Sequence, residues 1–174
     1  MNIRKATKND FDELVNFYDY MCSVLAKKDF MPDGNKGGFP SRDMLSEAIA
    51  QGEQFVGVED GKIIAAYMLN HDCDEAYLTA NWKVEAAKDE TVILHALRVL
   101  PEYSGKGYGK MLVRHAIETA RKRNQKAIHL DVLIGNKIPE KIFTGLGFEC
   151  VDTVEMCYAD IGVTRKFYLM ELAL

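Results

Sequence analysis

The chain has 174 residues, of which 48% are hydrophobic and 28% charged, and its formal net charge at pH 7 is −4. A chain of this length fits one α/β domain that buries roughly 70% of the surface exposed by the unfolded form. The acidic balance excludes a global positive field that would recruit nucleic acid or an anionic membrane, so we expect neither as a partner.

The ordinary targeting and metal-binding signals are not found in the sequence. Residues 1–10 carry charge without a following apolar segment, and the longest apolar run, residues 63–69, is too short to span a bilayer. The four cysteines have no CxxC spacing, so we expect free thiols and no metal site. We therefore expect a cytoplasmic protein.

The N-terminal half predicts a strand, a helix, a loop, a second helix and a strand pair. Asn9 or Asp10 can cap the first helix. Asp60-Gly61 is a strong hairpin signal between the two strands. The glycine- and proline-rich loop is either a plain connector or a lid over a substrate site. In chain order these elements cover residues 2–6, 11–25, 32–40, 42–50, 54–59 and 62–70.

The C-terminal half begins with a polar segment, residues 72–90, for which we predict at most one helical turn. A strand, a helix and a second strand then follow, and this order predicts a right-handed parallel crossover. The remaining strands can pair antiparallel, which gives a mixed sheet. With no repeat or linker visible, we expect residues 1–174 to form one domain. The predicted elements cover residues 91–99, 110–123, 128–133, 136–146, 149–157 and 166–172.

Between the strand 91–99 and its helix lies a loop with glycine at every second position: Gly105, Gly107 and Gly109. Glycines let the backbone approach a ligand, and a helix start offers unpaired N–H groups and the positive end of the dipole. This pattern predicts a phosphate site. It is not a dinucleotide fingerprint, because Lys110 stands where the third glycine would fall, and it is not a nucleotide P-loop, because Ser104 replaces the first glycine.

Two blocks together resemble the GCN5-related N-acetyltransferases, the GNAT family. The first is Val99-Leu-Pro101 followed by the glycine loop, and the second is Leu-Asp-Val-Leu-Ile-Gly-Asn at 130–136 with Phe-Thr-Gly-Leu-Gly-Phe at 143–148. The resemblance implies an α/β (α+β) GNAT-like fold with helices on both faces of a mixed, mostly antiparallel sheet of about seven strands. Its fourth and fifth strands would run parallel and splay apart to admit acetyl-CoA.

The resemblance also implies the residues that contact acetyl-CoA. The backbone of Leu97 and Val99 would pair with the pantetheine arm, and N–H groups of residues 105–110 would hold the pyrophosphate, with charge added by two lysines. Asn136 either caps the following helix or hydrogen-bonds the arm, and Phe143 packs against it. The complete set is Leu97, Val99, Ser104, Gly105, Lys106, Gly107, Tyr108, Gly109, Lys110, Asn136 and Phe143.

Two positions depart from the family pattern. Ser104 replaces the usual arginine or glutamine at the start of the loop, which predicts a modest loss of cofactor affinity. Phe143 replaces the tyrosine that is the proposed general acid in many members. Tyr158 and Tyr168, which we place on the final strands, are candidate substitutes. The missing acid also leaves an alternative open, namely a non-catalytic acyl-CoA-binding module or sensor.

His95 is the candidate base or proton relay. It lies two residues before Leu97, so a regular strand would place both on one face, and arylalkylamine acetyltransferases have a relay histidine at a similar position. The alternative is a hydrogen-bonded core histidine, and Glu90 is a weaker candidate base. A backbone N–H near Leu97 would serve as the oxyanion hole. We interpret His115 as a packing residue.

The implied reaction is acetyl transfer from acetyl-CoA to a primary amine of a small molecule or peptide. No residue looks like an acylated nucleophile, so direct attack in a ternary complex is expected. An acyl group other than acetyl and a homodimeric assembly are both left open. Acidic residues at Asp72, Asp74 and Glu75 can attract a cationic amine or form a solvated surface.

Overall fold

The computed structural model describes residues 1–31, 34 and 37–174. Its centre is one seven-stranded sheet with the strand order β1-β2-β3-β4-β5-β7-β6. All neighbours pair antiparallel except β4 and β5, which are parallel, and this confirms the predicted mixed sheet. The strands are β1 (Asn2–Lys5), β2 (Gln54–Glu59), β3 (Lys62–Asn70), β4 (Thr91–Val99), β5 (Ala127–Leu133), β6 (Glu149–Met156) and β7 (Arg165–Ala173).

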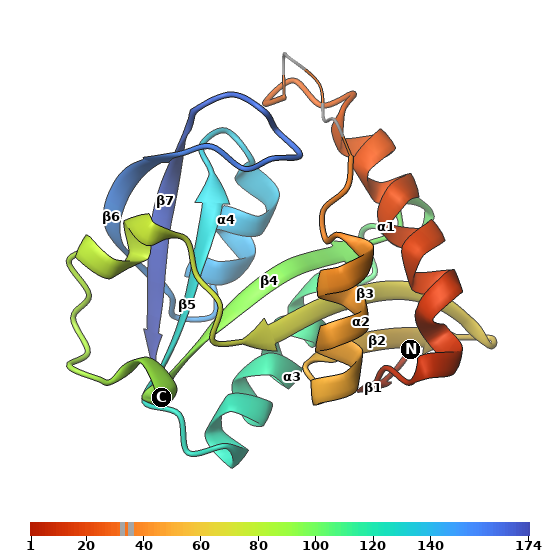
Figure 1. Ribbon diagram of the computed structural model, residues 1–174, viewed down its shortest axis with the longest axis horizontal. Helices are drawn as coiled ribbons and strands as arrows, with labels where there is room; N and C mark the ends of the chain where they lie inside the picture. Colours follow the sequence, from red (N-terminus) through yellow and green to blue (C-terminus); the bar gives the residue numbers. More distant parts are fainter. Residues whose placement is uncertain (32–33, 35–36) are drawn as a thin grey trace.

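The helices cover the two faces of this sheet, as the resemblance implied. The first pair, α1 (Phe11–Leu25) and α2 (Arg42–Gln51), lies on one face, and α3 (Tyr108–Lys122) and α4 (Lys137–Thr144) lie on the other (Figure 1). Each helix buries an apolar stripe against the sheet, as the helical spacing predicts. Four short 3₁₀ turns connect these elements: Lys8–Asp10, Glu75–Thr79, Lys88–Glu90 and Pro101–Tyr103.

Most predicted elements are found within one or two residues of their expected ends, and the larger differences concern α3 and the segment 72–90. α3 begins at Tyr108, two residues before the expected start, because Gly107 takes a left-handed φ of 78° and serves as its N-cap. The segment 72–90 contains two 3₁₀ turns, not at most one helical turn. Residues 32–33 and 35–36 of the predicted loop lie outside the described residues, so its role as connector or lid stays a prediction.

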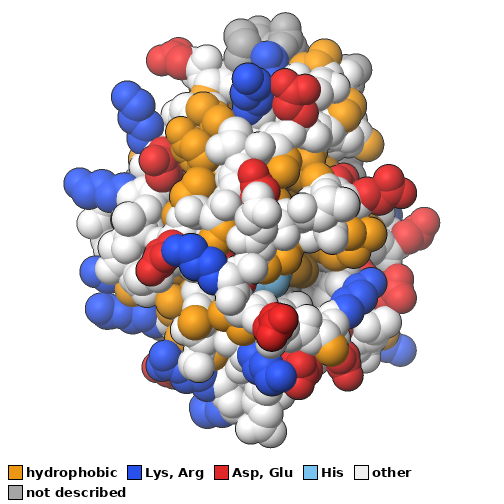
Figure 2. Space-filling model, turned by 90° about the vertical axis from the view of Figure 1, so that its left-hand side faces the viewer, with side chains coloured by type: hydrophobic (Ala, Val, Ile, Leu, Met, Phe, Trp, Pro, Cys, Tyr) orange, Lys and Arg blue, Asp and Glu red, His pale blue; other side chains and the backbone are white. Residues whose placement is uncertain are grey.

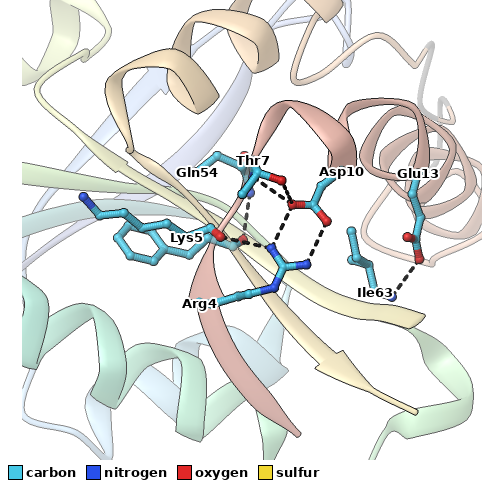
Figure 3. Close-up of polar contacts among 8 residues, drawn as sticks. Arg4, Lys5, Thr7, Asp10, Glu13, Gln54 and Ile63 are labelled. Atoms are coloured by element: carbon cyan, nitrogen blue, oxygen red, sulfur yellow. Dashed lines mark hydrogen bonds and ion pairs between the residues drawn. The ribbon is translucent and has the colours of Figure 1, made fainter. Parts of the chain in front are cut away.

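Asp10 occupies the N-cap position of α1, but its carboxylate does not cap that helix. It turns back to accept hydrogen bonds from both terminal nitrogens of Arg4 at 2.8 Å and from the N–H of Thr7 at 2.7 Å (Figure 3). The Arg4 guanidinium holds the pKa of Asp10 well below its usual range. This network fixes β1 to the start of α1. Close by, Glu13 accepts a hydrogen bond from the N–H of Ile63 in β3 at 2.7 Å.

The segment 72–90 packs over β5 and β7 through a second apolar cluster and a polar clamp. The ring of Trp82 stacks on His129 at 3.7 Å between centroids, with an interplanar angle of 3°. Nε2 of His129 lies 3.0 Å from the buried carboxylate of Glu171, which also accepts a hydrogen bond from the N–H of Lys83 at 3.0 Å. We call Trp82, His129 and Glu171 the Trp82 clamp. It fastens a segment that is otherwise almost without regular structure.

The outer surface on this side of the molecule is electrostatically mixed. Figure 2 shows lysine and arginine side chains interspersed with acidic and hydrophobic ones, without a continuous basic area on this face.

Within the described ranges, no helix combines the length and the apolar character needed to cross a membrane.

Candidate active site

The sheet opens between β4 and β5. The two strands pair only at Thr91–Ala127, Val92–Ile128 and Ile93–His129. Beyond these three pairs β4 continues to Val99 and β5 to Leu133 without pairing to each other, and the strands diverge in Figure 1. Unpaired strand edges expose backbone donors and acceptors, which an extended ligand can use. The observed splay confirms this part of the expected fold.

A β-bulge interrupts β4 within this opening. His95 pairs with Met68 and Arg98 with Ala66, so β4 contains one residue more than β3 over the same span. Ala96 has a left-handed φ of 48°, which an alanine adopts only at a cost of about 1–2 kcal/mol. The prediction that His95 and Leu97 share a face assumed unbroken alternation, and the bulge makes that assumption wrong.

The bulge also fixes two backbone carbonyls that a regular strand would direct elsewhere. The carbonyl oxygen of Ala96 accepts a hydrogen bond from the hydroxyl of Tyr18 on α1 at 3.3 Å. The carbonyl oxygen of Leu97 accepts one from Nη1 of Arg98 at 2.9 Å. Contacts to α1 and to a neighbouring side chain thus hold the strand in its bulged form next to the gap.

The glycine loop is exposed and has the geometry of an anion site. Gly105 and Gly107 take φ values of 79° and 78°, and a Cβ built on either would meet nothing within 4 Å. Within the part of the chain that the structure describes, the N–H groups of residues 105–107 have no protein acceptor. The first N–H groups of α3 are unpaired because they belong to the first helical turn. The loop therefore presents a row of free donors to solvent.

The two loop lysines differ in their surroundings. Nζ of Lys106 lies 3.8 Å from a carboxylate oxygen of Glu59 and 4.7 Å from the centroid of the Tyr103 ring. The hydroxyl of Tyr108 donates a hydrogen bond to the same Glu59. Lys110 is exposed on the first turn of α3. Glu59, the last residue of β2, thus joins Lys106 of the loop to the β2–β3 hairpin.

Glycine at position 109 is explained by the packing of α4 against α3. A Cβ at this position would lie 3.2 Å from Cδ1 of Ile142 on α4, which is tighter than ordinary contact. The glycine therefore lets α4 approach the start of α3. Its predicted contact with acetyl-CoA stays a prediction.

The structure distinguishes the two alternatives for Asn136. This residue occupies the N-cap position of α4, but its side chain forms no capping hydrogen bond, so the plain N-cap interpretation is wrong. Phe143 is 5% exposed and packs against Phe148 with their ring centroids 5.4 Å apart. Little of its ring is left for a ligand, and its contact with the pantetheine arm stays a prediction.

The charge of a carboxylate that the sequence interpretation did not select acts on His95. Asp131, on β5, accepts hydrogen bonds at one oxygen from the hydroxyls of Tyr77 at 2.7 Å and Tyr158 at 2.9 Å. Nε2 of His95 is buried and has no hydrogen-bond partner among the described residues. Burial lowers the pKa of His95, and the carboxylates of Asp131 and Asp72 partly oppose this change. His95 is therefore neutral at neutral pH, the state in which it can accept a proton.

The two candidate acids lie on opposite faces of the sheet. Tyr158 packs edge-on against Phe167 at 5.3 Å, and it lies in the loop after β6, not on a final strand as expected. Burial and the Asp131 carboxylate raise the pKa of Tyr158. Tyr168, the next residue after Phe167 in β7, points to the other face and lines a cavity of about 320 Å³ with Phe148. We call His95, Asp131, Tyr77 and Tyr158 the His95 group, and of the two candidate acids Tyr158 belongs to it.

Glu90 and His115, the other two titratable residues considered from the sequence, have a surface and a packing role. Glu90 forms an ion pair with Lys126 at 2.8 Å, so it is not placed to act as a base. Nδ1 of His115 lies 2.6 Å from the hydroxyl of Tyr67, which confirms its interpretation as a packing residue.

Asp131 and Tyr77 are the residues that the sequence interpretation missed. Asp131 is the one acidic residue within the apolar strand 128–133, and a charge at such a position is a signal, because charged side chains are rarely buried without a partner. Tyr77 gave no comparable signal. It reaches Asp131 from 54 positions away, through a segment without periodicity.

Comparison with known proteins agrees with this geometry. A stretch of 75 residues is 35% identical to an uncharacterised N-acetyltransferase of Methanocaldococcus jannaschii, and it covers 43% of this chain and 33% of that protein. The chain thus matches about a third of the length of this curated relative.

Two solved structures share the fold over nearly the whole chain. A GNAT-family acetyltransferase from Streptococcus pneumoniae is similar with a TM-score of 0.73, 20% identity and 99% of each chain covered. An acetyltransferase structure from Salmonella typhimurium, described with acetyl-CoA as its cofactor, is similar with a TM-score of 0.70 and 18% identity, covering 100% of this chain and 94% of that one. At these identities the similarity establishes the fold alone.

The sequence profile of the acetyltransferase (GNAT) family matches residues 21–148, a range that contains the β4 bulge, the glycine loop and the Asn136 to Phe148 block. The protein belongs to the GNAT acetyltransferase family.

Proposed function

We propose that the protein transfers an acetyl group from acetyl-CoA to a primary amine of a small molecule or peptide, by direct attack in a ternary complex. Residues 1–174 act in this proposal as one N-acetyltransferase domain of the cytoplasm. Family membership supports the reaction type. The Salmonella structure, described with acetyl-CoA, supports the choice of cosubstrate.

The exposed glycine loop carries the proposal. Gly105 and Gly107 leave open space where a Cβ would lie, and among the described residues the N–H groups of 105–107 have no protein acceptor. Such a row of donors at a helix start is complementary to a pyrophosphate. Lys106 and Lys110 add charge, and the free amide of Asn136 and the unpaired edge of β4 at Leu97 and Val99 are available to the pantetheine arm. Ser104 and Tyr108 flank these groups.

The chemistry needs one proton acceptor. The amine nitrogen attacks the thioester carbonyl and forms a C–N bond, and the developing oxyanion is stabilised by a backbone N–H near Leu97. His95, neutral and with a free Nε2, takes the proton that the nitrogen loses. When the tetrahedral intermediate collapses, the C–S bond breaks and the sulfur carries away the electron pair.

The departing thiolate does not require a protein acid. A thiol with a pKa of ~8.5 is a tolerable leaving group without prior protonation, so Phe143 slows the reaction without preventing it. Tyr158 is the better placed of the two candidate acids, since it lies in the His95 group. Its hydroxyl already donates to Asp131 at 2.9 Å, which makes it a weak donor to sulfur.

The test is release of free CoA from acetyl-CoA in a panel of amines that includes diamines, amino acids, aminoglycosides, arylalkylamines and peptides. We expect CoA release with at least one class and formation of the acetylated amine by mass spectrometry. If acetyl-CoA raises the melting temperature but no amine releases CoA, the protein is an acyl-CoA-binding module. A stronger response to another acyl-CoA would replace acetyl as the transferred group.

A further inference from the structure

The two oxygens of the Asp131 carboxylate have different surroundings. Oδ2 accepts both tyrosine hydroxyls. Oδ1 accepts no hydrogen bond from any residue in the described ranges. A carboxylate that leaves the water at the protein surface needs donors on both oxygens. Oδ1 is therefore an acceptor without a donor among the described residues, on the part of β5 that does not pair with β4.

Both acidic and basic side chains act on the residues around this oxygen. Asp72 acts on His95, and Asp74 and Asp160 act on Tyr158, each through its carboxylate charge. On Asp131 itself burial raises the pKa, and the charges of His95 and Arg98 oppose this change. The ionised carboxylate of Asp131 attracts a cation and repels an acidic ligand.

The walls of the site suit an alkyl ammonium group. The ring of Tyr158, whose hydroxyl donates to Asp131, lies 6.2 Å from the ring of Phe39 and 5.3 Å from that of Phe167 between centroids, so an aromatic group borders the carboxylate. Tyr77 belongs to an apolar cluster with Ile93. Aromatic faces attract cations and also accommodate methylene groups.

The acetylated nitrogen cannot be the lasting partner of Asp131. It has to be uncharged when it attacks, and it is an uncharged amide in the product. An anchor that holds the acceptor through the reaction therefore needs a second positive charge on the same molecule.

We propose that Oδ1 of Asp131 binds the remote ammonium of the acceptor, and that the acceptor is accordingly an aliphatic diamine. This inference rests on the proposed acetyl transfer and names its substrate class. Tyr77 and Tyr158 orient the carboxylate, and His95 accepts the proton from the nitrogen that is acetylated. The chain that joins the two nitrogens spans the opening between β4 and β5.

Binding of three butane derivatives of equal chain length tests the proposal by calorimetry, with the protein saturated with CoA. They are the diamine, the amino alcohol and the amino acid. We expect the diamine to bind about 10- to 100-fold more tightly than the amino alcohol, the amino acid to bind most weakly, and Asp131→Asn to bind the diamine and the amino alcohol equally. Asp12→Asn is the matched control, because that carboxylate is 91% exposed on α1.

Two results would overturn the proposal: equal affinities for the diamine and the amino alcohol in the unmodified protein, or an undiminished preference in Asp131→Asn. If Asp131→Asn does not fold, Tyr77→Phe and Tyr158→Phe replace it, and each should weaken diamine binding while CoA binding stays the same. Failure of the proposed function has a separate signature, since the diamine would then bind with the expected preference while acetyl-CoA releases no CoA.

Discussion

Substitutions at Gly107 separate backbone strain, bulk and charge at the glycine loop. The residue has a φ of 78° and open space where a Cβ would lie, so Gly107→Ala meets no atom and introduces only left-handed strain. That strain is about 1–2 kcal/mol, which lowers the melting temperature by about 2 to 8 °C in a chain of this size. Gly61→Ala, with the same φ of 78° and the same open surroundings, should lower it equally.

Binding of CoA should respond differently from stability. Gly107→Gln adds bulk above the loop donors, and Gly107→Glu adds the same bulk with a negative charge. A unit charge about 4 Å from a phosphate costs between ~1 and ~4 kcal/mol for effective dielectric constants between those of water and the protein surface, which corresponds to at least about fivefold in affinity. Gly107→Glu should therefore bind CoA more weakly than Gly107→Gln, and the difference should shrink at high salt.

Calorimetric titration of CoA into the four variants and the unmodified protein measures these effects. Gly61→Ala should bind CoA like the unmodified protein despite its loss of stability. The assignment of the loop as a pyrophosphate site would be refuted by equal CoA affinities of Gly107→Glu and the unmodified protein. An equal loss in Gly107→Gln and Gly107→Glu would refute the electrostatic part of the reasoning.

Three further predictions concern titratable groups. His95→Gln should lower kcat by about 10²- to 10⁴-fold and abolish an inflection below pH 6.5 in the pH profile of kcat/KM, because His95 has a lowered pKa and can no longer accept a proton once it is protonated at low pH. An unchanged pH profile of kcat/KM would exclude His95 as the base. Asp10→Asn should lower the free energy of unfolding, measured in urea at pH 7, by about 1–2 kcal/mol. This difference from the unmodified protein should diminish as the pH falls below about 4, because Arg4 stabilises only the ionised form of Asp10 and thereby lowers its pKa. Asp12→Asn should change little at either pH. Glu171→Gln should speed hydrogen exchange in residues 72–90 while exchange in α3 stays unchanged, since the Trp82 clamp loses its charge-assisted contacts.

The sequence was informative wherever the signal was local. The hairpin 54–59 and 62–70 and the strand 91–99 have the observed boundaries, because turn residues and apolar runs mark them within a few positions. The glycine loop could be predicted for the same reason, because a left-handed backbone and a close approach of the backbone to a ligand both favour glycine. The helix start at Tyr108 was misplaced by two residues, since glycine at an N-cap is a weaker signal than serine or aspartate.

The site depends on contacts that no local pattern encodes. The bulge in β4 arises from its register with β3, and alanine at position 96 gives no hint of a left-handed residue. The faces of Tyr158 and Tyr168 depend on where β6 ends and on the alternation along β7. The role of Asp131 depends on its hydrogen bond with Tyr77, which comes from a segment remote in the sequence.

The three pairs that join β4 to β5 also determine how the sheet can deform. They divide it into a half of β1 to β4 and a half of β5 to β7, hinged at the closed end of the gap. From Ile93 to Val99 the free arm of β4 is about 20 Å long, at ~3.3 Å per residue, so a rotation of about 5° moves its tip by about 2 Å. Such a rotation would change the distance between His95 on one half and Asp131 on the other, and the contacts of α3 with β4 and β5 would have to shift with it.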